Sequence, residues 1–389
     1  MFQPFTEEHE HFRKTVRDFA EKELLPHADE WEESECFPNE VFKRAGDLGI
    51  LGAHYPESCG GSGGDFWFSV VKAEELPRCQ MAGTTMGLLV QSDMATPVIA
   101  DIGTREQIDE FLVPALAGDK IAALGVTEPN AGSDVSAIRT LARKDGDDYV
   151  LSGSKTYITN GTRCDFVTLL AKTNPQAGAH GCSFFLVPTN LAGFGVSRKL
   201  KKLGNKSSDT TEMFLEDVRV PKRYLLGQEN MAFMYLMQNF QSERLIACAS
   251  TTAGLFLALE DAVTWARDRV VFGKPIIKRE YWQQKLVDLY TKVEVGKAMT
   301  YRCADLYNHE KFVLNQPLSF ETVKLISMAK VYVAEIGSEV TDQCLQIHGG
   351  AGYMDEYRIS RVWRDQRLVR VGAGTTETMR YYIAKLLGF

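Results

Sequence analysis

The chain has 389 residues, a length that predicts two or three domains and a core large enough to need no disulfide bonds. Lysine and arginine total 44 against 51 aspartates and glutamates, so the net charge is −7, which argues against a general nucleic-acid-binding protein with a basic surface. No run approaches the roughly 18 consecutive apolar residues of a membrane span, and the N-terminus lacks the pattern of a secretory or transit signal. We therefore expect a protein without a membrane span in the cytoplasm, or in the mitochondrial matrix if a transit peptide has been removed.

The eight cysteines are scattered along the chain and form no Cys-x-x-Cys pair. In a chain of this size they indicate reduced thiols in a reducing compartment. His9 and His11 have no cysteine or histidine pair nearby to complete a zinc site, so we expect no metal.

Residues 6–120 have a mostly helical pattern. Thr6 can cap the first helix, Phe12, Val16 and Phe19 share a face, and Pro26 is expected to end that stretch. A glycine-rich segment at 59–64 is expected to connect two helices. These features predict an N-terminal helical domain over 1–121.

The middle of the chain changes to short β-prone runs that Gly, Asn, Asp and Pro separate. The runs lie at 149–151, 166–170, 183–187 and 213–215. They predict a compact all-β domain over 122–228.

From about 229 the pattern is helical to the end. Four stretches can be drawn, at 229–268, 282–312, 319–347 and 377–387, and this number suits a four-helix bundle over 229–389. The predicted fold class is therefore a multidomain α+β protein.

Six short segments are candidates for chemistry, and each has an ordinary structural alternative. Residues 125–134 form a small-residue loop suited to a planar or phosphorylated ligand, or a plain turn. Residues 155–161 read as a strand that enters an Asn-Gly turn. Residues 346–353 are glycine-rich but follow a predicted helix, so they lack the strand that a dinucleotide-binding motif requires and could be a helix-ending turn.

The other three segments lie in the predicted bundle. Glu243 stands in Ser242-Glu243-Arg244-Leu245 with apolar neighbours, and a carboxylate facing a dry interior has a raised pKa and can act as a base. The alternative is a Glu–Arg pair on a solvated helix face. Residues 269–274 could be a basic helix end, and residues 372–377 open the last helix, where free N–H groups suit an anion or a carbonyl oxygen, or simply a capped helix start.

Taken together in this order, the six segments resemble the acyl-CoA dehydrogenase family over essentially the whole chain. Two family signatures fit, at 125–137 and 346–365. Tyr157-Ile158-Thr159 is similar to the family's Trp-Ile-Thr flavin segment, and the stretch from Arg269 to Lys274 is similar to its adenine-side FAD motif. The resemblance implies an N-terminal helical domain, a middle β-barrel and a C-terminal four-helix bundle.

The resemblance also implies a reaction. An FAD enzyme of this family removes hydrogen from Cα and Cβ of an acyl-CoA thioester and leaves a trans-2-enoyl-CoA. A carboxylate takes the α proton, a hydride passes to flavin N5, and the electrons go to an electron-transfer flavoprotein. The similarity to the isovaleryl-CoA and citronellyl-CoA types implies a methyl-branched or medium-to-long acyl chain.

The catalytic carboxylate is displaced from its commoner position. Most members carry it in a Tyr-Glu-Gly-Thr stretch, which is Gly372-Ala373-Gly374-Thr375 here, and Ala373 cannot accept a proton. Members similar to isovaleryl-CoA and long-chain acyl-CoA dehydrogenases carry the base within Glu-Arg-Leu. The resemblance therefore implies Glu243 as the catalytic base and leaves the backbone N–H of Ala373 to bind the thioester carbonyl.

Ligand-binding residues follow from the same resemblance. For FAD they are Thr127, Ser133, Tyr157, Ile158, Thr159, Arg269, Phe272, Gln346, Gly349, Gly350, Thr375 and Glu377. For the substrate they are Ser133, Ser242, Arg244 and Gly374. Tyr157 replaces the usual Trp, and Glu280 stands where a FAD-contacting Gln is common, so we expect no contact from Glu280. Since Arg269 serves a neighbouring subunit's flavin in this family, a homotetramer built as a dimer of dimers is implied.

Two other functions are compatible with these motifs. One is an acyl-CoA oxidase, in which oxygen takes the electrons; such oxidases are usually longer, whereas this chain stops at Phe389 soon after the last predicted helix. The other is a non-catalytic flavin protein that binds DNA or a protein partner, against which the net charge and the displaced Glu243 both argue.

Overall fold

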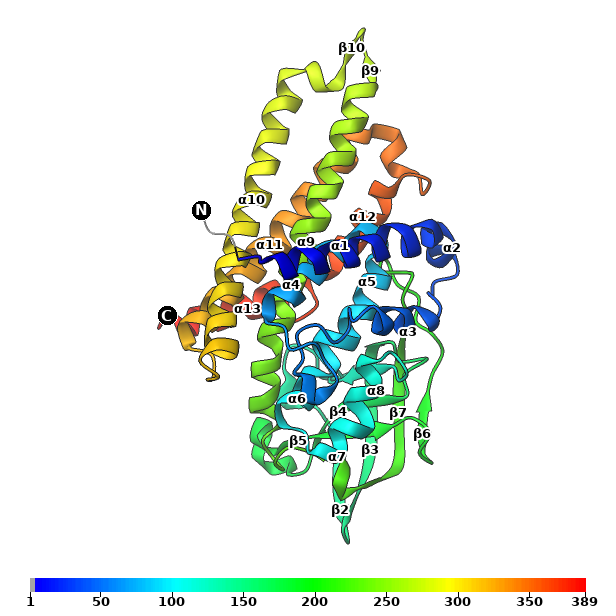
Figure 1. Cartoon of the computed structure of the whole chain (residues 1–389), viewed down its shortest axis with the longest axis vertical. Helices are drawn as coiled ribbons and strands as arrows, with labels where there is room; N and C mark the ends of the chain where they lie inside the picture. The colour runs from blue at the N-terminus through cyan, green and yellow to red at the C-terminus, as the bar shows by residue number, and fades with distance from the viewer. Residues whose placement is uncertain (1–3) are drawn as a thin grey trace.

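The computed structural model describes residues 4–389. Figure 1 shows an elongated molecule with a long helical hairpin at one end and a β-sheet at the other. Helix α9 (Ala232–Asp268) runs from the sheet towards the tip of the hairpin, so it borders every part of the fold.

The N-terminal part is helical, as predicted. Its α-helices are α1 (Glu7–Asp18), α2 (Ala28–Glu33), α3 (Glu40–Asp47), α4 (Phe66–Glu75), α5 (Ala82–Leu89), α6 (Pro97–Ile102), α7 (Arg105–Gln107) and α8 (Val113–Leu116). Thr6 caps α1 in a reciprocal pair with His9. The first helical stretch continues from α1 through a π-helical turn, Phe19–Leu24, and ends just before Pro26, close to the predicted end. Pro26 sits at the start of a separate 3₁₀ turn, Leu25–His27, where no backbone N–H is needed.

A buried ion pair fixes the N-terminal helix that faces the middle of the molecule. Lys72 Nζ on α4 lies 2.8 Å from the Asp93 carboxylate and donates to the Ser92 hydroxyl at 2.9 Å, and all three side chains are buried. Asp93 belongs to a π-helical segment, Val90–Ala95, that continues α5. Because a buried charge is tolerated only when it is paired, this contact holds α4 and the segment after α5 in one arrangement.

The middle part is one eight-stranded sheet. Its strands are β1 (Ala122–Gly125), β2 (Leu141–Asp145), β3 (Asp148–Thr159), β4 (Phe166–Lys172), β5 (Cys182–Pro188), β6 (Phe194–Val196), β7 (Thr210–Pro221) and β8 (Leu225–Leu226). The strand order is β6-β7-β3-β2-β4-β5-β8, with β1 parallel to β4. All four β-prone runs lie inside strands. A register shift between Lys155 and Ile158 places a bulge in β3 at Tyr157.

The C-terminal part contains the four predicted helices. They are α9, α10 (Glu280–Asn308), α11 (Phe320–His348) and α13 (Thr376–Leu386). Strands β9 (Val270–Val271) and β10 (Lys274–Pro275) form the tip between α9 and α10. A further helix, α12 (Arg358–Gln366), was not predicted. Its apolar residues Ile359, Val362 and Trp363 do recur at helical spacing, but a helix of 9 residues is short for a prediction from periodicity.

Two hydrophobic clusters stabilise this arrangement. The larger one joins the N-terminal helices, the sheet and the adjoining parts of α9, α10 and α11. The smaller one lies between the far halves of the same three helices and α12. The fold class is therefore confirmed as helical, sheet and helical-bundle parts in that order, while the exact boundaries after 121 and 228 stay predictions.

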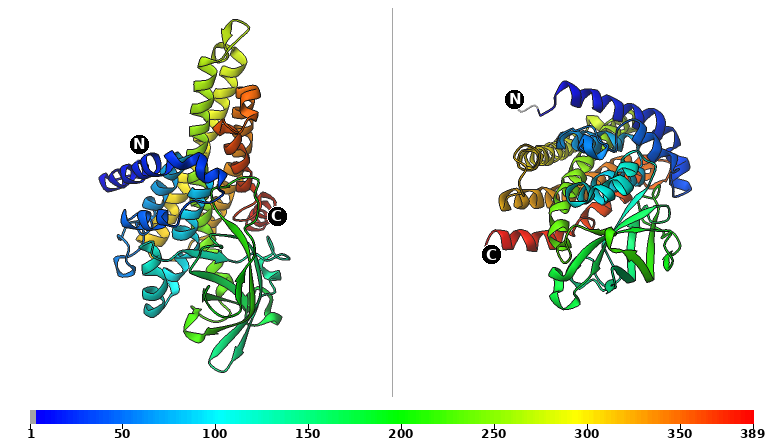
Figure 2. Two further views of the ribbon diagram at one scale, coloured as in Figure 1. Left: turned by 90° about the vertical axis from the view of Figure 1, so that its right-hand side faces the viewer. Right: turned by 60° about the horizontal axis from the view of Figure 1, so that its bottom comes forward.

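Helix α9 is long and apolar enough to cross a membrane by length and composition alone, with a mean hydropathy of 1.4 over its most apolar window. Half of that window is buried inside the protein. In Figures 1 and 2 the helix lies among other helices, and it packs on α4, α10 and α11. These are the properties of a central core helix.

Candidate active site

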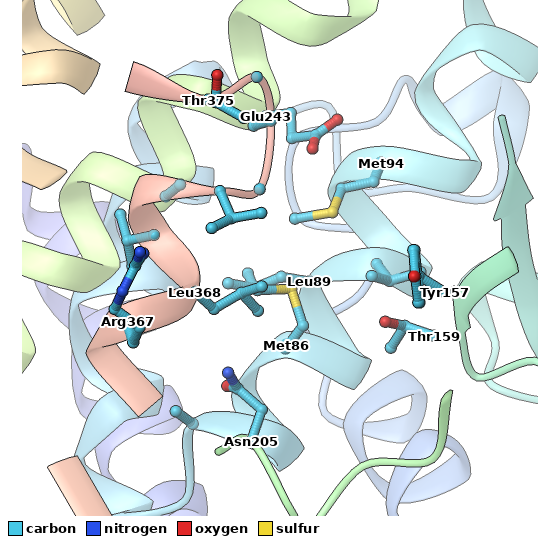
Figure 3. Close-up of a pocket in the computed structure, with 18 of the residues that line it drawn as sticks. Met86, Leu89, Met94, Tyr157, Thr159, Asn205, Glu243, Arg367, Leu368 and Thr375 are labelled. Carbon is cyan, nitrogen blue, oxygen red and sulfur yellow. The ribbon is translucent and has the colours of Figure 1, made fainter. Parts of the chain in front are cut away.

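A cavity of about 1670 Å³ opens where the three parts of the chain meet. In Figure 3, Met86, Leu89 and Met94 from the N-terminal helices, Tyr157 and Thr159 from β3, Glu243 from α9, and Leu368 and Thr375 from the C-terminal segment all surround it. Ligand pockets usually measure about 300–1,000 Å³. This cavity therefore has room for two ligands side by side.

Glu243 is the acidic group in the apolar part of this cavity. Its side chain points towards Met94 in Figure 3, and its Oε2 atom is buried without a hydrogen-bond partner among residues 4–389. Burial raises the pKa of Glu243 to about 7, and the nearby charges of Arg244 and Lys330 oppose that rise. A carboxyl group with this pKa can both accept and release a proton near neutral pH.

The alternative of a solvated Glu–Arg pair is wrong. Arg244 is only 4% exposed, and its Nε donates to the carbonyl oxygen of Ala373 at 3.2 Å. Its guanidinium also lies over the Phe240 ring and donates to Gln241. Arg244 therefore faces the interior and binds the backbone of the turn at residues 372–375.

The turn at 372–375 has an unusual backbone. Ala373 has φ of +54° and Gly374 has φ of +95°, a region that costs a residue with a Cβ about 1–2 kcal/mol. Arg244 holds the carbonyl of Ala373, and the Lys330 ammonium donates to the carbonyl of Gly374. Within the described chain the N–H of Ala373 donates to no other residue. It remains available as a donor to a ligand in the cavity.

The turn ends where α13 begins. The Thr375 hydroxyl accepts a hydrogen bond from the N–H of Thr378 at 3.2 Å and caps that helix. Figure 3 shows the segment that carries Thr375 passing beside Glu243. A carboxyl group and a free backbone donor, Ala373 N–H, thus come together from elements more than a hundred residues apart.

A second buried ion pair holds the loop of the first signature. Lys155 Nζ lies 2.7 Å from the Glu128 carboxylate, and both side chains are buried. Glu128 also accepts the N–H groups of Arg139 and Thr140 at 2.5 and 3.0 Å. These contacts pin the loop against β3, so that Thr127 and Ser133 line the cavity beside the bulge of that strand.

Tyr157 sits in that bulge with φ of +61°. Its side chain is 70% exposed, yet it lines the cavity together with Ile158 and Thr159. Strained backbone of this kind persists where the surroundings enforce it, often at binding sites. The bulge presents an aromatic surface and a hydroxyl group to a ligand.

The cavity wall is positively charged in a chain whose net charge is negative. Its acidic residues are Asp134, Glu243 and Asp365, whereas its basic residues are Arg198, Lys199, Lys201, Lys202, Arg244, Lys330, Arg358, Arg364, Arg367 and Lys385. A lining with this excess of cations attracts a ligand that carries phosphate groups.

Ten of the predicted site residues line the cavity. They are Thr127, Ser133, Tyr157, Ile158, Thr159, Glu243, Arg244, Ala373, Gly374 and Thr375. Ser242 does not: its hydroxyl donates to the Asn239 carbonyl at 2.9 Å within α9, so the geometry gives it no contact with a substrate. Glu377 is exposed at the start of α13 and also lies outside the lining.

The remaining predicted FAD residues lie on other surfaces of the bundle. Arg269 and Phe272 are at the hairpin tip, where Phe272 is 95% exposed. Gln346, Gly349 and Gly350 are exposed at the end of α11. Glu280 is exposed and accepts a hydrogen bond from Gln284 instead. The single chain therefore does not bring these residues to the cavity.

Sequence reasoning missed three buried anchors, Glu128, Lys155 and Lys330. A lone Lys or Glu in a strand or helix is usually solvated, so no local signal marks it. Within residues 4–389, no group of three or more His, Cys, Asp or Glu side chains is placed to hold a metal ion.

Two similar proteins carry a ligand or partner in their names. The structure of a glutaryl-CoA dehydrogenase from Mycobacterium smegmatis in complex with FADH2 has a TM-score of 0.90 and 28% identity, over 98% of this chain and 95% of that one. A subunit of the caffeyl-CoA reductase–Etf complex of Acetobacterium woodii is 35% identical over 98% of this chain and 99% of its own length.

The whole chain matches known domains and proteins. Family models for the N-terminal, middle and C-terminal domains of acyl-CoA dehydrogenases match residues 6–119, 123–218 and 232–388. The long-chain specific acyl-CoA dehydrogenase of mouse (Mus musculus) mitochondria is 40% identical over 98% of this chain and 86% of its own length. The acyl-CoA dehydrogenase structure from Geobacillus kaustophilus has a TM-score of 0.94 and 35% identity over the full length of both chains. The chain belongs to the acyl-CoA dehydrogenase family of oxidoreductases.

Proposed function

We propose that this protein dehydrogenates an acyl-CoA thioester between Cα and Cβ with FAD as cofactor, and that Glu243 removes the α proton. The observation that carries the proposal is the carboxyl group of the half-buried Glu243, whose Oε2 is buried without a partner among the described residues, in a cavity that also holds a free backbone donor, Ala373 N–H. The family membership supplies the reaction class, and the geometry supports the roles of these two groups.

The cavity suits a flavin dinucleotide together with a CoA thioester. It is larger than one ligand requires, its wall carries excess positive charge for phosphates, and Tyr157 offers an aromatic face beside the hydroxyls of Thr127 and Thr159. When bound, the flavin supplies the hydride acceptor of the reaction. Thr127, Ser133, Tyr157, Ile158, Thr159 and Thr375 would hold it from this chain, and Ser133 and Gly374 would also contact the substrate.

Removing the α proton of a thioester requires two things of the protein. The base must be desolvated so that its proton affinity approaches that of the activated substrate, as burial does for Glu243. The negative charge that develops on the carbonyl oxygen must meet preorganised donors. The N–H of Ala373 fits this second role, since its turn is fixed and no protein acceptor competes for it among the described residues.

The face of α9 that carries Glu243 supports a long acyl chain. Ala247, Ser250 and Gly254 follow Glu243 at helical spacing and line the cavity. A Cβ at Gly254 would meet only the Cβ of Pro77, at 4.0 Å, so neither packing nor backbone conformation requires a glycine there. By the rise of a helix, Gly254 lies about 16 Å along the axis of α9 from Glu243.

Room for a branch lies closer to the base. A Cβ at Gly372 would meet only the Leu368 residue, at 3.6 Å or more, although Gly372 lines the cavity. We therefore propose a long or methyl-branched acyl-CoA as substrate. The name of the mouse relative, a long-chain specific enzyme, supports the first of these features.

The distant FAD residues support an assembled enzyme. Arg269 and Phe272 at the hairpin tip, and Gln346, Gly349 and Gly350 at the end of α11, are exposed in the single chain. We propose that they complete the FAD site of a neighbouring subunit in a homotetramer. The name of the Acetobacterium woodii relative supports an electron-transfer flavoprotein as acceptor, and the reduced thiols support a cytoplasmic or matrix location.

Glu243→Gln is expected to abolish flavin reduction while FAD and acyl-CoA still bind. Glutamine keeps the shape of the side chain but cannot accept the proton, so the rate should fall by at least about 10³-fold. Anaerobic rapid mixing with a panel of straight and branched acyl-CoAs measures it. Glu260→Gln, at an exposed position of the same helix, is the matched control. Bleaching of Glu243→Gln near the wild-type rate would exclude this base; partial activity in Glu243→Gly/Ala373→Glu would support it.

The raised pKa of Glu243 predicts a pH dependence of both catalysis and stability. The value kcat/KM of flavin reduction should rise with pH up to about 7 and then level off, because the base must be unprotonated. Since the folded-state pKa exceeds the ordinary value of 4.5, the contribution of Glu243 to wild-type stability should fall as pH rises from 4.5 to 7.

The stability of Glu243→Gln provides the check. Its advantage over wild type should grow across that pH range to a limit of about 3 kcal/mol above pH 7. Denaturant unfolding of both holoproteins at pH 5 and 8 measures it. Equal stability differences at the two pH values would contradict a buried carboxyl at this position.

Gly254→Leu is expected to shift substrate preference towards shorter chains. The new side chain enters the cavity, so kcat/KM for the longest acyl-CoA should fall by about 10-fold or more, which is the effect of losing the contacts of one or two methylene groups. Short substrates should keep their rates. Leucine favours a helix more than glycine, so the fold should not weaken. Gly254→Ala is the small-residue control. An unchanged chain-length profile would contradict an acyl chain along this face.

Arg269→Ala is expected to lose bound FAD and the tetramer together. The wild-type protein should be yellow and elute near four times the 43.5 kDa chain mass. Flavin absorbance and light scattering after gel filtration report both properties. A variant that remains a tetramer with full flavin content would show that Arg269 does not reach a neighbouring site.

A further inference from the structure

Lys330 is a buried cation that the proposed reaction has not used. It lies on α11, is 1% exposed and lines the cavity. Burial lowers its pKa to about 8; Cys248, Glu243 and Glu377 counter that effect, and Arg244 adds to it. A buried ammonium is costly unless its hydrogen bonds are satisfied.

The hydrogen bond that Lys330 makes goes to a neutral group. Its Nζ donates to the carbonyl oxygen of Gly374, and no carboxylate oxygen within the described chain lies within ion-pair distance of it. The charge is therefore directed at the turn that carries Ala373 and not at a counter-ion.

The turn needs such an anchor. Ala373 is in the left-handed region without being a glycine, and a residue keeps that conformation only where its surroundings enforce it. Arg244 holds the peptide plane after Ala373, and Lys330 holds the next plane, after Gly374. Gly374 alone would allow this second plane to rotate, and Ala373 could then relax and turn its N–H away.

The two cations also bear on the site electrostatically. The peptides whose carbonyls they bind carry the N–H groups of Gly374 and Thr375, so their charge reaches the N–H of Ala373 through space and not by polarising its own peptide. The cations also stand close to the place where negative charge would develop on a thioester oxygen. The position of the turn and the positive charge of Arg244 and Lys330 would therefore both stabilise negative charge on the thioester oxygen.

We infer that Lys330 is a positioning residue, which holds the Ala373–Gly374 turn so that the N–H of Ala373 points at the thioester oxygen of the substrate. This inference rests on the proposed function. It adds a residue that contacts the turn and not the substrate.

The test uses the carbonyl stretching frequency of bound substrate. In the holoenzyme with Glu243→Gln, an acyl-CoA labelled with ¹³C at the thioester carbonyl binds without reacting, and infrared difference spectra report the hydrogen bonding of that carbonyl. We expect binding to lower the frequency. Adding Lys330→Met should remove at least half of that lowering, whereas adding Lys330→Arg should preserve most of it.

Controls separate a local effect from a loss of folding. Lys324→Met makes the same change on the same helix, where Lys324 pairs with Glu321, and it should leave the frequency unchanged. Flavin content and thermal midpoint verify each variant. In the enzyme that keeps Glu243, Lys330→Met alone should slow flavin reduction at saturating substrate by about 10- to 10²-fold, with little change in substrate affinity. This loss is smaller than the one expected from removal of an oxyanion donor itself.

The outcomes distinguish the role of Lys330 from the proposed function. A lowered frequency in Glu243→Gln that Lys330→Met leaves intact would overturn the inference and leave the proposed function standing. Absence of binding, or binding with no shift in Glu243→Gln itself, would overturn the proposed role of Ala373 and the inference with it.

Discussion

The site depends on shielding the carboxyl group of Glu243 from solvent while two cations, Arg244 and Lys330, lie close to it. Glu243 is buried enough for its pKa to rise to about 7 despite Arg244 and Lys330. If either cation paired with it directly, the pKa of the carboxyl would fall. Both cations are instead bound to backbone carbonyls of the turn at 372–375. The same contacts thus leave the carboxyl unpaired and fix the backbone donor opposite it.

The rest of the fold serves to bring three walls to this point. Lys72 and Asp93 hold the N-terminal wall, and Glu128 and Lys155 hold the loop against the sheet. Helix α9 supplies the third wall and touches both of the others (Figure 1). Each anchor is a buried charge matched by its partner. Removing one partner would cost more than the pair contributes, because the other charge would stay buried and unpaired.

Much of the fold could be predicted from local pattern. The β-prone runs became parts of β3, β4, β5 and β7, and the four helical stretches became α9, α10, α11 and α13, because apolar periodicity survives in long elements. Helix α12 was missed because its 9 residues are too few for apolar periodicity to stand out.

The order of the three parts and the family motifs can be read from the chain before it folds, and so can the expectation that Glu243 replaces a glutamate at position 373. Which of these residues share a cavity depends on how distant segments pack, and this became clear in the folded chain. Ser242 and Glu243 are neighbours in the chain, yet a helix turns consecutive side chains by about 100°, so one bonds its own backbone and the other faces the cavity. Lys330 became visible only in the fold, because its partner, the carbonyl of Gly374, is a backbone atom that every residue carries, and no side-chain pattern in the sequence marks it.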